Sequence, residues 1–309
     1  MINKVFVDGR EGTTGLKIIE RLEGRADVEL LLIDSELRRD KVARREFINR
    51  SDFTFLCLPD DAARESVSLV ENESVKIIDA STAHRLDWTY GFPELTRAAE
   101  KRESHYDKIK SSKRVAVPGC YACGFIALSA PLIAAGIIAP DEPLTAFGIS
   151  GYSGAGKAAI ADYESPDRPK SYDSPRLYAL GQEHKHLPEM QKYSGLSQPP
   201  MFNPIIDNYY SGMLVNIPLR AKSATAILET YERHYQNRPL IKTAKADGFL
   251  AANSLSGKDN LEIFVNADPA NERVLLTARF DNLGKGASGA AIQCFNIMSG
   301  CDETLGLWL

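Results

Sequence analysis

The sequence is poor in cysteine, and its five cysteines do not form the pattern of a disulfide-stabilised protein. Cys57, Cys120, Cys123, Cys294 and Cys301 are odd in number and widely spaced, so we expect free thiols. Cys120 and Cys123 have C-x-x-C spacing, but no second such pair and no H-x-x-H pair completes four metal ligands. The sequence therefore predicts neither a disulfide framework nor a metal site.

Two further absences limit the location and the partners of the chain. It has no apolar run long enough to cross a membrane and no secretory signal ahead of its first strand-like residues. Its 37 basic and 41 acidic residues give a net charge of −4, without the basic excess typical of nucleic-acid-binding proteins. We therefore expect a cytoplasmic protein with no nucleic-acid or membrane partner. Its 309 residues suffice for two domains.

The first part of the chain alternates short apolar runs with amphipathic segments. The strand-like runs are residues 4–8, 28–34, 53–58 and 75–79, and the helix-like segments are residues 16–22 and 63–70. Such alternation is typical of a parallel, doubly wound sheet, which binds ligands at the carboxyl ends of its strands. We predict an α/β fold with a Rossmann-like domain at the N-terminus.

A glycine-rich turn joins the first strand to the first helix and predicts a dinucleotide site. Its candidate cofactor residues are Gly9, Gly12, Thr13, Thr14 and Gly15. Backbone N–H groups in such a turn can approach a pyrophosphate at the helix N-terminus. After the second strand, Asp34 favours NAD, whereas Ser35, Arg38 and Arg39 favour the 2′-phosphate of NADP. A solvated, charged helix start is an equally good interpretation of the arginines.

Two further loops lie at the same predicted edge of the sheet. Pro59 follows the third strand and Ser81 follows the fourth, and both are candidate cofactor contacts. Arg85 is a candidate clamp for an anionic group of a substrate. A surface arginine paired with an acid is the alternative for Arg85.

Cys120 lies where a short strand, residues 115–117, meets Pro118 and Gly119 and a long apolar helix begins. We predict that helix over residues 125–138. The positive end of a helix favours the thiolate, which is the nucleophilic form of cysteine. Cys120 is therefore a candidate nucleophile, and a buried structural thiol is the alternative.

The second part of the chain predicts a mostly antiparallel sheet. Its strands are expected at residues 144–150, 213–219, 260–265 and 273–279, with a helix at residues 223–236. Residues 151–157 are predicted to be a flexible loop in which Ser153 and Lys157 could contact an anion. Residues 163–182 are predicted to be a long functional loop.

Two regions further along the chain add candidate residues. His184 and His186 could relay protons or donate to an oxyanion, although exposed histidines at a helix start are the alternative. Near the C-terminus, a glycine loop opens a helix of small residues. We expect this helix to return to the first domain and to bring Asn282 and Gly286 near the cofactor.

Taken in order, five motifs resemble those of the N-acetyl-gamma-glutamyl-phosphate reductases in their shorter form. They are Gly9-Arg-Glu-Gly-Thr-Thr-Gly15, Asp79-Ala-Ser-Thr-Ala-His-Arg85, Pro118-Gly-Cys-Tyr121, His184-Lys-His-Leu-Pro-Glu189 and Asn282-Leu-Gly-Lys-Gly-Ala287. The resemblance implies the semialdehyde dehydrogenase fold: a Rossmann-like NADP-binding domain (1–117 with 285–309) and an α+β substrate and oligomerisation domain (118–284). It also implies NADP(H) and a homodimer or homotetramer.

The resemblance further implies a reaction in arginine biosynthesis. Cys120 attacks the acyl phosphate of N-acetyl-glutamyl 5-phosphate, and NADPH reduces the resulting thioester to the semialdehyde. His184 or His186 assists proton movement, and substrate contacts are expected from Arg85, Ser153, Lys157 and Glu189. The family often has Pro-Thr-Gly where this chain has Ala122-Cys123-Gly124. A sister reductase of aspartyl or aminoadipyl substrates and a non-catalytic NADP sensor are the alternatives.

Overall fold

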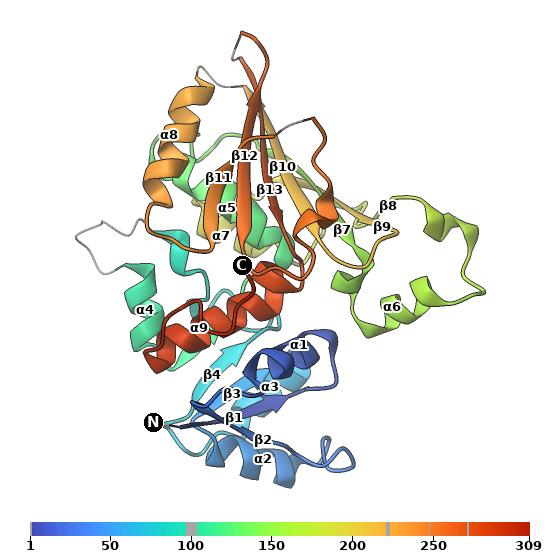
Figure 1. Ribbon diagram of the computed structural model, residues 1–309, viewed down its shortest axis with the longest axis vertical. Coiled ribbons are helices and arrows are strands. Elements are labelled where there is room, and N and C mark those ends of the chain that lie inside the picture. The colour runs from blue at the N-terminus through green and yellow to red at the C-terminus, as the bar shows by residue number, and fades with distance from the viewer. Residues whose placement is uncertain (1, 97–103, 221–222, 247, 271) are drawn as a thin grey trace. The chain divides into compact units, whose positions relative to one another are not determined.

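A computed structural model describes residues 2–96, 104–220, 223–246, 248–270 and 272–309 (Figure 1). The chain divides into two compact units. The first unit comprises Met1–Phe92, Tyr106–Pro118 and Ala287–Leu307, and the second comprises Pro93–His105, Gly119–Gly286 and Trp308–Leu309. Among the described residues, no helix combines the length and the apolar character needed to cross a membrane.

The first unit contains a parallel sheet with the strand order β2-β1-β3-β4-β6-β5. Its strands are β1 (Asn3–Asp8), β2 (Val28–Leu31), β3 (Phe53–Leu56), β4 (Lys76–Asp79), β5 (Thr89–Tyr90) and β6 (Arg114–Ala116). The main helices are α1 (Thr13–Leu22), α2 (Lys41–Arg50), α3 (Asp60–Ser68), α4 (His105–Ser111) and α9 (Gly289–Ser299). The predicted Rossmann-like, doubly wound arrangement is confirmed.

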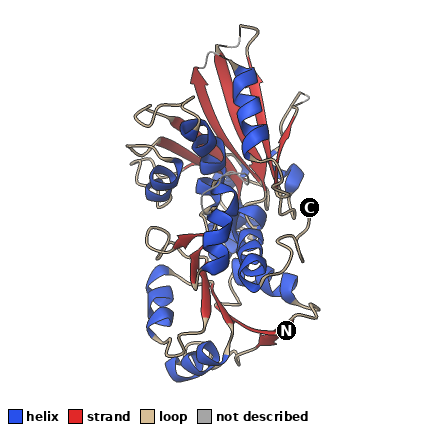
Figure 2. Ribbon diagram, turned by 90° about the vertical axis from the view of Figure 1, so that its left-hand side faces the viewer, coloured by secondary structure: helices blue, strands red, loops and turns tan. Residues whose placement is uncertain are grey.

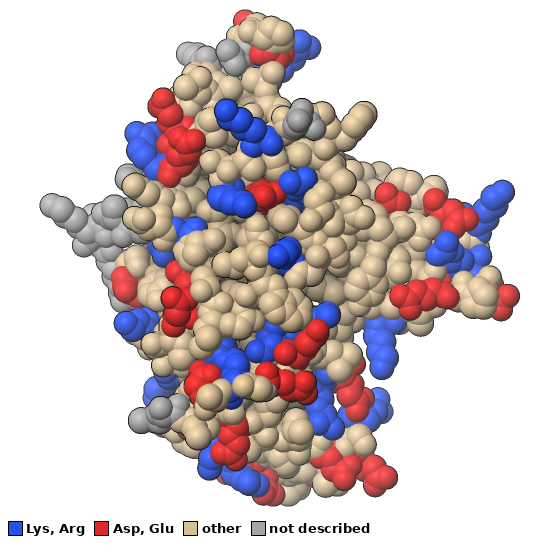
Figure 3. All heavy atoms as spheres, in the orientation of Figure 1, with Lys and Arg blue, Asp and Glu red and all other residues tan. Residues whose placement is uncertain are grey.

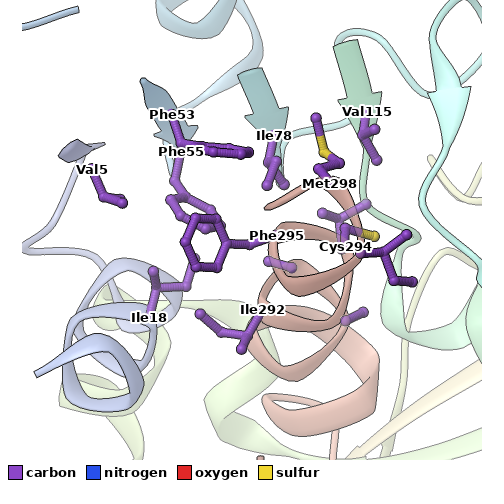
Figure 4. Packing of buried hydrophobic residues seen from close by; sticks show 14 of the residues in the cluster. Val5, Ile18, Phe53, Phe55, Ile78, Val115, Ile292, Cys294, Phe295 and Met298 are labelled. Carbon is purple, nitrogen blue, oxygen red and sulfur yellow. The ribbon is translucent and has the colours of Figure 1, made fainter. Parts of the chain in front are cut away.

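The last helix, α9, completes the core of the first unit (Figure 4). Phe295 of α9 packs edge-on against Phe53 of β3, with ring centroids 4.8 Å apart, and it also contacts Phe55. Ile292 of α9 and Ile18 of α1 lie in the same cluster. The chain therefore returns to its first sheet after building the second unit, and the small residues of α9 permit this close packing.

The second unit contains a mixed sheet with the strand order β11-β12-β13-β10-β7-β9-β8. Its strands are β7 (Thr145–Gly151), β8 (Arg176–Leu177), β9 (Met201–Asp207), β10 (Met213–Arg220), β11 (Ile241–Ala244), β12 (Leu261–Ala267) and β13 (Arg273–Phe280). Only the pairs β11–β12 and β7–β9 are parallel among these described strands. The predicted, mostly antiparallel sheet is confirmed.

Helix α5 (Cys120–Ala134) is the central helix of the second unit. Every residue from Tyr121 to Leu132 is buried, which explains why the helix is apolar on all sides. Gly124 lies so close to Val215 of β10 and Phe280 of β13 that an added Cβ would be 2.7–2.9 Å from their side chains. The helix therefore packs directly on the sheet.

Two further helices, α7 (Leu187–Ser194) and α8 (Ala224–His234), pack against α5. Helix α8 runs alongside the strands in Figures 1 and 2. The Tyr231 hydroxyl of α8 donates to the carbonyl of Leu128 at 2.6 Å, and the Tyr235 hydroxyl donates to Ala127 at 2.7 Å. Two buried hydrogen bonds therefore fix α8 against α5.

The predicted flexible loop is wrong, whereas the predicted long loop contains only short regular segments, and its functional role stays a prediction. Residues 152–155 form a 3₁₀ turn rather than a flexible loop, and α6 (Lys157–Glu164) follows it. The segment 163–182 contains a second 3₁₀ turn (Lys170–Asp173) and the short strand β8. Aromatic contacts order this region: the Tyr152 and Tyr163 rings stack at 4.6 Å, and the Arg176 guanidinium lies 3.6 Å from the Tyr172 ring centroid.

Other boundaries differ modestly from prediction. The helix predicted from residue 125 begins at Cys120, because Gly119 takes the extended N-cap conformation directly before it. The strand predicted over 28–34 ends at Leu31. Acidic and basic side chains are intermixed over the face drawn in Figure 3, as expected from their near balance in composition.

Candidate active site

The predicted glycine turn is closely packed at two of its three glycines. Gly9 has a φ of +87°, and a Cβ there would lie 2.3 Å from the carbonyl oxygen of Cys57. A Cβ on Gly15 would lie 2.5 Å from the Gly9 oxygen. At Gly12 an added Cβ would make only ordinary contacts, 3.4 Å or longer. Packing therefore requires glycine at positions 9 and 15, whereas at position 12 a Cβ could be accommodated.

The N-terminus of α1 fits the phosphates of a dinucleotide. Gly12 is the N-cap residue, and Thr13 and Thr14 open the helix. Gly12 donates its N–H to the Gly9 carbonyl at 3.0 Å, which closes the turn. Because the first turn of α1 contains no acidic residue, its N–H groups and positive dipole end suit an anion.

The residues after β2 favour a 2′-phosphate. Arg38 donates to the Ser35 carbonyl at 3.0 Å and to the Glu11 carboxylate of the glycine turn at 3.2 Å. Both hydrogen bonds lie at the surface. Arg39 is exposed in the same segment. The Asp34 carboxylate accepts the N–H of Glu36 at 3.1 Å. Ser35, Arg38 and Arg39 are thus exposed in the segment after β2, and their contact with a 2′-phosphate stays a prediction.

The loop after β4 is shaped by a buried carboxylate. Asp79 accepts both the N–H and the hydroxyl of Ser81 at 2.8 Å, and it lies 2.6 Å from Nδ1 of His84. Arg85, which we predicted as a substrate clamp, is 6% exposed and donates to the carbonyls of Val117 and Ala80. Its guanidinium thus connects the loops after β4 and β6. Pro59 is the N-cap residue of α3.

Cys120 is the first residue of α5 and is partly exposed. The N-cap residue Gly119 donates its N–H to the Glu189 carboxylate of α7 at 3.1 Å. Glu189 is 2% exposed, so this contact is buried. The predicted substrate contact Glu189 therefore holds the start of the helix that carries the thiol, and the helix N-terminus favours the thiolate of Cys120.

Cys123 differs from Cys120 in its exposure to solvent. It is fully buried, and burial raises the pKa of Cys123 to about 12. Its Sγ donates to the Lys285 carbonyl at 3.6 Å. Gly286 follows, and a Cβ there would lie 2.9 Å from Cβ of Cys120. Gly286, predicted near the cofactor, thus packs against the candidate nucleophile.

The two predicted histidines lie close together and in different environments. Their ring centroids are 4.6 Å apart, and both side chains are at least nine-tenths buried. Nδ1 of His184 accepts the backbone N–H of His186 at 3.1 Å. A ring nitrogen that accepts a hydrogen bond carries no proton, so neutral His184 carries its proton on Nε2. His184 therefore presents an N–H donor.

Tyr121 and Tyr178 connect His184 with Cys120. The Tyr121 ring, next to Cys120 in sequence, meets His184 edge-on at 5.6 Å, and the Tyr178 hydroxyl lies 3.5 Å from Nε2 of His184. Burial of its hydroxyl raises the pKa of Tyr178, a hydrogen bond with Tyr121 lowers it, and the charge of Cys120 raises it further. Sequence analysis missed Tyr178, whose only signal was an aromatic residue in a polar segment.

Ser153 and Asn282 contact each other. The amide of Asn282 donates to the Ser153 hydroxyl at 3.0 Å, and its oxygen accepts the N–H of Gly212 at 2.8 Å. Both side chains are 1% exposed. Lys157 is exposed at the start of α6. The structure thus brings Ser153 together with Asn282, which were predicted to serve different ligands.

Comparison with known proteins decides the family. The chain is 44% identical to the N-acetyl-gamma-glutamyl-phosphate reductase of Trichormus variabilis over 98% of this chain and 99% of that protein. It is also 44% identical to N-acetyl-gamma-glutamyl-phosphate reductase 2 of Pseudomonas putida over 98% of both chains. This chain belongs to the N-acetyl-gamma-glutamyl-phosphate reductase family. The resemblance inferred from the five motifs is confirmed.

Family models and solved structures support the predicted semialdehyde dehydrogenase fold. The semialdehyde dehydrogenase NAD binding domain matches residues 4–102, and the semialdehyde dehydrogenase dimerisation domain matches residues 120–282. Aspartate semialdehyde dehydrogenase II of Vibrio cholerae, complexed with ASA, superimposes with a TM-score of 0.73 at 15% identity, over 97% of this chain and 99% of that chain. Aspartate semialdehyde dehydrogenase of Candida albicans, solved with NADP, superimposes with a TM-score of 0.66 at 14% sequence identity, over 97% of this chain and 99% of that chain.

Proposed function

We propose that this chain reduces N-acetyl-glutamyl 5-phosphate to N-acetyl-glutamate 5-semialdehyde with NADPH, in arginine biosynthesis. The observation that carries the proposal is the partly exposed Cys120 at the N-terminus of α5, whose neighbour Tyr121 contacts His184, a histidine with a defined tautomer. The glycine turn would hold the pyrophosphate of NADPH, and Ser35, Arg38 and Arg39 would hold its 2′-phosphate. When bound, NADPH supplies the hydride.

Cys120 performs the covalent steps. Its thiolate attacks the acyl carbon of the substrate, the bond from this carbon to the phosphate oxygen breaks, and a thioester remains on the sulfur. The released phosphate takes up the one proton that the overall reaction consumes. The thioester keeps the acyl group bound to the chain in an activated form that accepts hydride, as a free carboxylate would not. After reduction, the thiohemiacetal collapses to the aldehyde and Cys120 leaves as the thiolate. The balance is one acyl phosphate, one NADPH and one proton consumed, with one aldehyde, one phosphate and one NADP⁺ formed.

His184 handles the proton. Its Nε2–H can donate to the oxyanion of each tetrahedral intermediate and can give that oxyanion a proton when the thiohemiacetal forms. The proton returns to Nε2 when the thiohemiacetal hydroxyl is deprotonated, its oxygen becomes the aldehyde oxygen and the C–S bond breaks. Nδ1 cannot serve in this way because it accepts the N–H of His186. We therefore assign the acid–base role to His184 and a role in shaping the loop to His186.

The reverse reaction tests the proposal. Purified protein is mixed with N-acetyl-glutamate 5-semialdehyde, NADP and phosphate, and NADPH formation is followed by absorbance. Phosphate-dependent reduction of NADP with this substrate alone supports the proposal. A signal only with aspartate semialdehyde would move the chain to the sister reaction, and NADPH binding without turnover on either substrate would favour a sensor. Cys120→Ala should keep NADPH affinity and lose turnover by several orders of magnitude.

We also propose a homo-oligomer built through the open face of the second sheet. Val215 and Gly148 face α5, so alternate residues such as Phe147, Ile149 and Leu214 face the opposite side. Phe147 and Ile149 stay half-buried there in the single chain. Light scattering distinguishes a dimer or tetramer from a monomer, and replacing Ile149 by Lys should dissociate the assembly. A cytoplasmic location remains a prediction.

A further inference from the structure

A fully buried ion pair lies in the second unit, and neither of its residues has been assigned a role in the reaction so far. The Lys285 ammonium contacts the Glu94 carboxylate at 2.7 Å, and both side chains are 0% exposed. Glu94 is in the 3₁₀ turn Pro93–Leu95, and Lys285 is in the π-helical turn Gly284–Ser288. Burying two charges is costly, so such a pair is poor support for a role in stability alone. A specific geometry is the better explanation.

The π-helical turn is the surface on which the first turn of α5 rests. The Lys285 carbonyl accepts the Sγ–H of Cys123, and Gly286 packs against Cβ of Cys120. Cys120 and Cys123 are three residues apart, so they lie on the same side of the helix. A displacement of Lys285 would therefore move both supports of the nucleophile together. π-Helical turns are rare and occur frequently at functional sites.

The partner of Lys285 is itself held in place. The carbonyl of Glu94 lies 2.9 Å from Nε2 of His234, which is in α8. Arg238, shortly after α8, donates to the carbonyl of Thr96 at 3.1 Å. Because α8 is also bonded to α5 through two tyrosine hydroxyls, Glu94 has a fixed position relative to α5. The Lys285 ammonium is therefore paired with a carboxylate whose position is set by α8.

We propose that Glu94 and Lys285 are a positioning pair for Cys120: their ion pair holds the π-helical turn against the first turn of α5. Neither residue is assigned a contact with the substrate, and both act through Gly286 and Cys123. The inference rests on the proposed function for its kinetic consequence. Its chemical consequence, the reactivity of the Cys120 thiol, can be measured without any substrate.

Replacing Lys285 by Met removes the ammonium and keeps a side chain of similar length. The Glu94 carboxylate then stays buried near α5 without its counter-charge. At Cys123 this carboxylate already raises the pKa of the thiol and the ammonium lowers it, with burial as the main cause of the shift. The thiolate of the neighbouring Cys120 should therefore become harder to form, and the turn that supports it should move.

The experiment measures alkylation of Cys120 by iodoacetamide against pH, with tandem mass spectrometry to separate Cys120 from Cys123. In Lys285→Met we expect the midpoint of the alkylation profile to rise by about one pH unit and the rate at pH 7 to fall about tenfold, since the thiolate is the reactive form. We expect kcat to fall about 10- to 100-fold, as for a misplacement of up to 1 Å. NADPH affinity, measured by fluorescence titration, should stay within about twofold because the glycine turn is untouched.

A matched control separates positioning from loss of stability. Leu276 in β13 is fully buried, so Leu276→Ala destabilises the same unit without touching the pair. At a temperature where both variants are folded, Leu276→Ala should keep the alkylation profile and kcat of the original protein. Equal losses in the control and in Lys285→Met would overturn the proposal, as would a folded Lys285→Met with unchanged alkylation.

Glu94→Gln provides the second variant if Lys285→Met does not fold. It keeps an acceptor for Lys285 but removes the carboxylate, so kcat should fall while the alkylation midpoint does not rise. Full kcat in a folded Glu94→Gln would show that the π-helical turn keeps its position without the Glu94 charge, which would refute the pair. If the original protein reduces none of the acyl phosphates, the proposed function fails, but the alkylation profiles still decide the positioning.

Discussion

Adding one methyl group at Gly286 should displace the nucleophile. A Cβ at this position would lie 2.9 Å from Cβ of Cys120, 3.2 Å from the Asp281 carbonyl and 3.3 Å from the Phe280 ring. Carbon atoms in good contact are about 3.5–4.0 Å apart, so Gly286→Ala requires a separation of about 0.6–1.1 Å. The Asp281 carbonyl and the Phe280 ring hinder residue 286 from moving away from Cys120. The first turn of α5 must therefore take up much of the displacement.

The expected kinetic loss follows from that displacement. A misplacement of about 1 Å in a reacting group can cost about 100-fold in rate, and we expect kcat of Gly286→Ala to fall by about that factor. Overpacking should also lower the free energy of unfolding by about 1–3 kcal/mol. NADPH affinity should fall much less than kcat, because the glycine turn expected to hold the pyrophosphate is unaltered.

Steady-state kinetics with N-acetyl-glutamyl 5-phosphate, together with NADPH titration and urea unfolding, provide the assay. Gly181→Ala is the control, because a Cβ at Gly181 meets no atom within 4 Å and its φ is not positive. That variant should keep kcat within about twofold, as for an uncrowded surface change. A folded Gly286→Ala with kcat near that of Gly181→Ala would refute the argument that Gly286 supports Cys120.

Three further predictions concern the cofactor, the second thiol and the core. Arg38→Ala should weaken NADPH binding about tenfold or more while leaving NADH binding nearly unchanged, since a charge-assisted phosphate contact is lost; equal effects on both cofactors, measured by fluorescence titration, would contradict it. Because burial raises the pKa of Cys123 to about 12, its thiol stays protonated at pH 8, and mass spectrometry should find Cys120 alkylated there and Cys123 unmodified. Phe295→Ala should lower the free energy of unfolding by about 3–5 kcal/mol in urea titration, and a loss below about 1 kcal/mol would show that α9 is not part of the core.

Local patterns were sufficient for most of the fold. The alternation of apolar runs and amphipathic segments predicted the parallel sheet, because the spacing of apolar residues in each strand and helix shows which of its faces is buried. Pro118 and Gly119 likewise predicted a break directly before Cys120. The start of α5 was placed five residues late because Cys120 and Gly124 are poor helix formers, and the close approach of Gly124 to β10 and β13 overrides that preference.

Contacts between distant residues could not be predicted. Glu94 and Lys285 are 191 positions apart, and Ser153 and Asn282 are 129 apart, so no local pattern joins them. The order in residues 152–177 similarly depends on stacked tyrosines and on Arg176 rather than on helix or strand propensity. One signal was available: a lysine within the small-residue segment that leads into α9 conflicts with burial unless a partner exists.

The supports of Cys120 come from three parts of the second unit and act in different ways. Glu189 of α7 accepts the N–H of Gly119 just before the thiol, and Gly286 contacts the Cys120 side chain from the π-helical turn. Glu189 also places a negative charge at the helix N-terminus, which opposes the thiolate. The Glu94–Lys285 ion pair adds no net charge, so it can fix the thiol with less opposition to ionisation than a lone carboxylate. A buried ion pair suits this position better than a single buried carboxylate would.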